Sequence, residues 1–147
     1  MNLTALNIAA GNTAGVAEIW LDGTGGGSSL VREVSGKRVF VKMTTLDTLI
    51  KRMKIASVDA IVIDAEGYEG QILMGSQDNL ANVVFVAVEI HHFISGQLGM
   101  RVDELMRSSG FQCQRELVES RSPYITFRLY EKVQGLTGGP GLRSRAD

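Results

Sequence analysis

Carboxylates gather in one short stretch near the middle of the chain. The stretch Ile63 to Gly70, IDAEGYEG, follows a run of apolar residues and contains Asp64, Glu66 and Glu69. Carboxylates in such a position act as acids, bases or cation ligands, and they also accept hydrogen bonds from the free N–H groups of a helix N-terminus. This stretch therefore leaves a catalytic and a helix-capping interpretation open.

A second polar group follows the next apolar run along the chain, NVVFVAVE. Glu89 ends that run, and His91 and His92 come directly after it. Adjacent side chains on an extended chain point to opposite faces, so we do not expect the two histidines to bind one ion together. A histidine close to Glu89 and Asp64 would serve as a base or as a metal ligand, or it would be a solvated loop residue, and these alternatives stay open.

The polar residues come after predicted strands that alternate with predicted helices. Val58 to Ile63 and Asn82 to Glu89 are predominantly apolar runs, which is typical of strands covered by helices on both faces. Helices are predicted at Thr44 to Met53, at Glu66 to Met74 and around Val102, Leu105 and Met106. This alternation predicts a parallel sheet, whose ligands bind beyond the carboxyl ends of its strands. Asp64 and Glu89 occupy those ends, and we expect them to face one cleft.

The flanking segments predict two strand pairs. Leu3 to Ala10 and Val16 to Leu21 are interpreted as a hairpin, and so are Phe111 to Leu117 and Tyr124 to Tyr130. The expected fold is thus an α/β domain over residues 1–132, with a mostly parallel sheet and an antiparallel C-terminal strand pair. The Gly- and Arg-rich residues 133–147 predict a disordered tail.

Composition restricts the classes of function. The 147 residues carry a formal net charge of −1 without a run of Lys or Arg, so nucleic acid is not an expected partner. Cys113 is the only cysteine, which excludes an intramolecular disulfide, and its alternating strand context predicts a buried, unreactive thiol. The apolar runs are too short to span a bilayer, and the sequence predicts a soluble, cytoplasmic protein without a membrane partner.

Three separated motifs occur in an order that resembles the FkbM family of S-adenosylmethionine-dependent methyltransferases. They are TTLDTLI, VDAIVIDAEGYEGQILMG and VVFVAVEIHH, followed by a helix that ends in SSGF. The earlier segment LNIAAGNTAGVAEIWL is similar to the third strand of that family, so the resemblance extends from Leu3 to about Tyr130. Val62 is a departure, because many members carry a lysine at this position.

The resemblance implies a partial Rossmann-like fold and methyl transfer from S-adenosylmethionine to a hydroxyl of a small molecule, such as a sugar or a secondary metabolite. It implies that Asp64 borders the methionine end of the cofactor and that His91 is the base. It also implies that Glu66 and Glu89 bind the acceptor or orient Asp64. The cofactor-binding residues that it implies are Ala9, Ala10, Asp64 and Gly67. It implies no resident metal.

One part of the family pattern is not found. The D-x-G-x-x-x-G turn that approaches the cofactor, and the strand before it, have no counterpart ahead of Leu3. We therefore expect a chain that corresponds to the C-terminal portion of the fold, with an open sheet edge at the strand ending in Asp64. Two other functions remain open: a non-catalytic remnant or module that pairs with another chain, such as a second copy, through that edge, and a metal-dependent hydrolase that uses Asp64, Glu66, Glu89 and His91.

Overall fold

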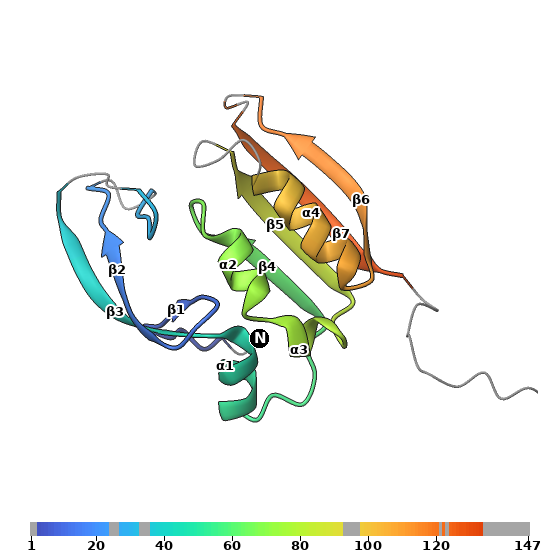
Figure 1. The fold of residues 1–147 in the computed structure, drawn as a ribbon, viewed down its shortest axis with the longest axis horizontal. Coiled ribbons are helices and arrows are strands. Elements are labelled where there is room, and N and C mark those ends of the chain that lie inside the picture. Colours follow the sequence, from blue (N-terminus) through green and yellow to red (C-terminus); the bar gives the residue numbers. More distant parts are fainter. Residues whose placement is uncertain are drawn as a thin grey trace, which may run out of the picture.

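The computed structural model describes residues 3–23, 27–32, 36–92, 98–120, 122 and 124–133, and it has an α/β fold with two sheets (Figure 1). The first sheet has the order β1 (Ala9–Ala10), β3 (Arg38–Thr44), β2 (Gly15–Trp20). The second has the order β4 (Ala60–Asp64), β5 (Phe85–His91), β7 (Ile125–Lys132), β6 (Phe111–Val118). The helices are α1 (Leu46–Arg52), α2 (Glu69–Met74), α3 (Gln77–Leu80) and α4 (Leu98–Ser108). Apart from Val133, the predicted tail lies outside the described residues.

The main core lies between the second sheet and helices α2 and α4. Figure 1 shows α2 between the two sheets and α4 across the second one. The core side chains include Ile61 and Ile63 of β4, Val86, Val88 and Ile90 of β5, Leu73 of α2, and Val102 and Met106 of α4. None of the helices in the described part of the chain has the length and apolar character needed to cross a membrane.

The second sheet is covered on one face only. Burial alternates along β4, and Val62, between the buried Ile61 and Ile63, is 79% exposed. Leu117 and Phe127 are exposed as well. The prediction that helices cover both faces is therefore wrong for the described residues, because α2 and α4 pack on the same side of the sheet.

Strand directions confirm part of the predicted topology. β4 and β5 are parallel and place Asp64 opposite Glu89, as predicted. β6 and β7 form the predicted antiparallel C-terminal pair. However, β7 rather than β6 pairs with β5, and this pairing is antiparallel, so the sheet is mixed and the expectation of a mostly parallel sheet is wrong. Cys113 is exposed on the edge strand β6, which corrects the predicted buried thiol.

The first sheet also differs from the predicted hairpin. β2 pairs with β3 in antiparallel register, from Gly15 opposite Met43 to Trp20 opposite Arg38. β1 instead pairs with β3 in parallel. The Gly11 N–H donates to the Thr44 carbonyl 3.0 Å away, which continues the contact of β1 with β3 beyond the strand. The segment before β2 therefore lies along β3 and does not form a hairpin with β2.

Helix α1 has a different cap from the one that spacing suggests. Thr44 and Asp47 fit the spacing of a capping box. In the structure Thr45 is the N-cap, and its Oγ1 accepts a hydrogen bond from the Thr48 N–H at 3.0 Å. The Asp47 carboxylate accepts the N–H groups of Asp78 and Asn79 at 3.1 and 3.0 Å, so it caps α3 instead.

This cap leads to a first prediction. We expect Asp47→Ala to lower the free energy of unfolding by about 1–2 kcal/mol, because two N–H groups of α3 lose their acceptor. Urea denaturation followed by circular dichroism measures the change. Glu104→Ala, which removes an exposed carboxylate from the middle of α4, is the matched control, with an expected change within about 0.5 kcal/mol. Equal losses in the two variants would contradict the capping role.

Candidate functional site

Four of the predicted site residues lie together at the carboxyl ends of β4 and β5. His91 is buried, with 1% of its surface exposed. Its Nε2 atom lies 4.0 Å from Asp64 Oδ1 and 3.7 Å from Glu89 Oε1. The same atom lies 3.7 Å from Glu66 Oε2. We call Asp64, Glu66, Glu89 and His91 the carboxylate–histidine cluster. Parallel pairing of the two strands brings these side chains together, while their individual roles stay predictions.

A fifth residue, Glu69, forms a hydrogen bond with the other ring nitrogen of His91. Glu69 begins α2 and is fully buried, and its Oε1 lies 2.7 Å from His91 Nδ1. A carboxylate only accepts hydrogen bonds, so Nδ1 carries the proton and Nε2 faces the cluster. The same Oε1 accepts the Gly67 N–H at 2.9 Å. Sequence reasoning did not assign Glu69 a role in the site, although it precedes the core residue Leu73 by four positions and so shares its buried helix face.

Burial and the neighbouring negative charges shift the pKa values of two members of the cluster. Burial by itself would lower the pKa of His91, but the hydrogen bond with Glu69 and the negative charges of Glu69, Glu66 and Glu89 outweigh burial and raise it above the ordinary value. The pKa of Glu89 is also raised, first by desolvation and then by the charge of Asp64. Both shifts favour positive charge at the cluster and disfavour further negative charge.

A cavity of about 380 Å³ opens beside the cluster. Ala9 and Ala10 line one wall of it, and Asp64 and Glu66 line another. Ser29 Oγ donates to the Glu66 carbonyl at 3.0 Å, which ties the residues after β2 to the residues after β4. The structure thus brings the predicted cofactor residues Ala9 and Ala10 to the same cavity as the acids. The volume is within the range of small-molecule sites.

Gly67 is not among the described residues that line the cavity. It is buried, has a φ of 99°, and gives its N–H to Glu69. A side chain at this φ would be strained, so glycine allows the turn that places Glu69 beneath His91. The structure therefore gives Gly67 a supporting position, and contact with a cofactor stays a prediction.

A second, apolar cavity lies on the open face of the second sheet. It has a volume of about 330 Å³, and Asp64 and Glu89 line it together with Val62, Leu117 and Phe127. Members of the cluster therefore line both cavities, and Asp64 lines each of them. His92 does not belong to the cluster, since its Nε2 lies 2.9 Å from Thr126 Oγ1; the two histidines diverge as predicted.

Comparison with protein families matches residues 1–113 to the methyltransferase FkbM domain. The match includes both walls of the 380 Å³ cavity and all of the carboxylate–histidine cluster. Comparisons with curated proteins and with solved structures gave no match.

Proposed function

This chain belongs to the FkbM methyltransferase family, and from that premise we propose that it transfers a methyl group from S-adenosylmethionine to a hydroxyl of a small molecule such as a sugar or a secondary metabolite. The observation that carries the proposal is the cavity shared by Ala9, Ala10, Asp64 and Glu66, directly beside His91. Family membership favours methyl transfer over metal-dependent hydrolysis, the other chemistry open to these acids.

The cavity suits the cofactor in shape and charge. The small side chains of Ala9 and Ala10 leave room for a flat ring against β1. When bound, S-adenosylmethionine supplies an electrophilic methyl carbon on a positively charged sulfur. The carboxylates of Asp64 and Glu66 line this space and would stabilise positive charge there.

The cluster also accounts for the fate of the acceptor proton. A hydroxyl placed against Glu89 and Asp64 would give up its proton to the carboxylate–histidine cluster as it accepts the methyl group. The fixed positions of Asp64 and Glu89 on paired strands orient the acceptor, and orientation supplies a large share of the acceleration in such transfers.

Calorimetric titration of the 147-residue chain with S-adenosylmethionine tests the proposal. We expect binding in the micromolar range and its loss in Ala10→Phe, whose ring fills the cavity. Ala56→Phe is the matched control, because Ala56 is exposed and lies outside the cavity. A folded chain that takes up no cofactor, or an Ala10→Phe variant that binds it as well as the parent, would overturn the assignment.

A second candidate function, pairing with another copy, is favoured by the edge of β4. β4 is the terminal strand of its sheet, and the exposed Val62 lies on it. Such an edge is a template for strand addition. Light scattering should then find a dimer, and Val62→Lys should dissociate it. Val16→Lys, which makes the same substitution at an exposed valine of β2, should leave the dimer intact. A monomeric parent chain would remove this candidate.

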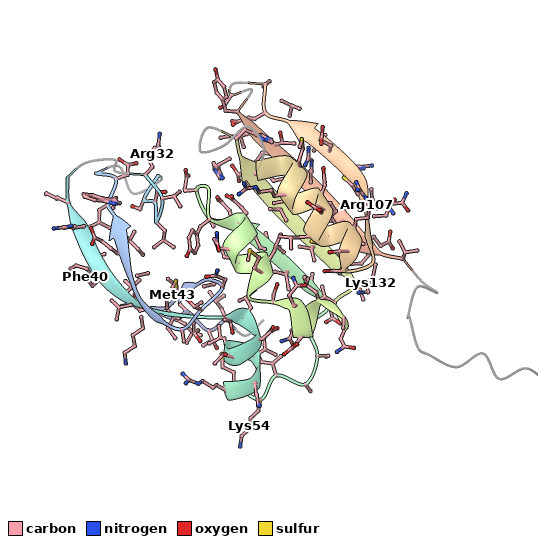
Figure 2. The ribbon with its side chains drawn as sticks, viewed as in Figure 1. Arg32, Phe40, Met43, Lys54, Arg107 and Lys132 are labelled. Atoms are coloured by element: carbon pink, nitrogen blue, oxygen red, sulfur yellow. The ribbon has the colours of Figure 1, made fainter. Side chains whose placement is uncertain are left out.

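Backbone strain at Glu66 gives a further prediction. Glu66 has a φ of 47° and Lys54 has a φ of 54°, the two non-glycine residues with positive φ in the described part of the chain. Replacing either residue by glycine relieves the strain, so we expect the free energy of unfolding of each variant to rise by about 0.5–1 kcal/mol. Lys54 projects outward beyond α1 (Figure 2). Only Glu66→Gly should weaken cofactor binding in the calorimeter; a loss of binding in both would contradict the role of the carboxylate.

A further inference from the structure

The cluster has the composition and spacing of a cation site. One ligand atom each from Asp64, Glu89 and His91 lies within 4.8 Å of the others. A six-coordinate divalent cation with bonds of about 2.1 Å holds adjacent ligand atoms about 3 Å apart. The Asp64 side chain is 61% exposed, so it is free to rotate and close the remaining distance. Glu89 and His91 are fixed on the inner strand β5.

Glu69 provides an independent indication. Histidines that ligate metals commonly donate their second ring N–H to a carboxylate, which fixes the ring and directs the other nitrogen to the metal. Glu69 and His91 have this arrangement, at 2.7 Å and fully buried. Glu69 Oε2 is buried and has no hydrogen-bond partner among the described residues. A buried carboxylate in that state needs positive charge nearby, and a cation on Nε2 would supply it through the ring.

The net charge of the cluster also favours a bound cation. Four carboxylates lie within 4.0 Å of the two ring nitrogens of His91. An imidazole contributes at most a single positive charge, so the group carries surplus negative charge. Repulsion of this kind falls when a divalent cation binds between the oxygens.

We propose that Asp64, Glu89 and His91 Nε2 bind a divalent cation that accepts both carboxylate oxygen and imidazole nitrogen, as Mn²⁺ does. This inference rests on the proposed function, because the cation would bind the acceptor hydroxyl oxygen and make its proton more acidic. Glu66, which is outside the ligand set, then takes that proton, and His91 acts as a ligand in place of the base implied by the family resemblance.

Titration of the full chain with Mn²⁺, followed by electron paramagnetic resonance, tests the inference. We expect a single Mn²⁺ per chain, with affinity at least about tenfold weaker in Asp64→Asn and in Glu89→Gln. Asp59→Asn, which makes the same charge change at an exposed residue outside the cluster, should alter the affinity by less than about twofold. The parent spectrum should also show nitrogen coupling from an imidazole, a readout that requires no histidine variant.

Three results would overturn the cation site: no saturable Mn²⁺ binding, equal affinity in all four proteins, or an absence of nitrogen coupling. Calorimetry with S-adenosylmethionine in the presence of a chelator separates this inference from the proposed function. Cofactor binding by a chain that takes up no Mn²⁺ would remove the cation and leave methyl transfer in place. Mn²⁺ binding by a chain that takes up no cofactor would keep the site and remove methyl transfer.

Discussion

Replacing His91 by leucine is expected to lower the free energy of unfolding by about 3–5 kcal/mol, a large part of the stability of a domain this size. His91 and Glu69 are both fully buried and 2.7 Å apart. Leucine fills most of the space of the ring but leaves the buried Glu69 carboxylate without its hydrogen bond to histidine. Urea denaturation at neutral pH, monitored by circular dichroism, measures the loss.

A double variant separates the effect of charge from that of packing. In Glu69→Gln/His91→Leu no buried charge remains, and the glutamine oxygen still accepts the Gly67 N–H. We therefore expect the double variant to be more stable than His91→Leu alone. His92→Leu is the matched control and should cost about 1 kcal/mol, since it removes one hydrogen bond with Thr126. If the double variant is less stable than His91→Leu, an unpaired buried charge is not the cause of the stability loss in His91→Leu.

The site was partly predictable because its acids end apolar runs. Asp64 and Glu89 each follow a run of apolar residues in the sequence, and parallel pairing then places them opposite one another without further information. Glu69 was not predictable in the same way. A carboxylate at the start of a helix is commonly an exposed cap, and only the packing of α2 against β5 and α4 shows that this one is buried.

The fold was less predictable where partners are distant in sequence. Apolar runs such as Val58 to Ile63 show that a strand is largely apolar, but they do not show whether a second layer of helices covers it. Val62 is apolar and yet exposed on the open face. The pairing of β2 with β3 and of β7 with β5 depends on competition among several strands of similar pattern, which no single segment encodes.

A contact between two glycines positions the wall of the 380 Å³ cavity that Ala9 and Ala10 form. A Cβ on Gly75 would lie 1.9 Å from the Gly11 carbonyl oxygen and 2.9 Å from its carbon. The Gly75 carbonyl also accepts the Asp47 N–H at 3.1 Å, so the end of α2 is held against α1. Because Gly11 directly follows Ala9 and Ala10, this backbone contact sets the distance between the first sheet and the acids after β4.

Gly75→Ala is therefore expected to cost about 3 kcal/mol of unfolding free energy, because the added methyl meets backbone rather than a movable side chain. It should also weaken S-adenosylmethionine binding, since the first sheet must shift. Gly11→Ala meets the flexible Met43 Sδ at 2.7 Å and should cost about 1 kcal/mol. Gly15→Ala meets nothing within 4 Å and serves as the control.

The order of these three losses, measured by urea denaturation, tests whether the junction is rigid. If Gly75→Ala costs no more than Gly11→Ala, the two sheets move apart easily and the 380 Å³ cavity is not held at a fixed width. If the stability loss appears without any change in cofactor binding, Ala9 and Ala10 do not form a wall of the cofactor site. A parallel fall in stability and in binding is expected only if the glycine contact places β1 against the carboxylate–histidine cluster.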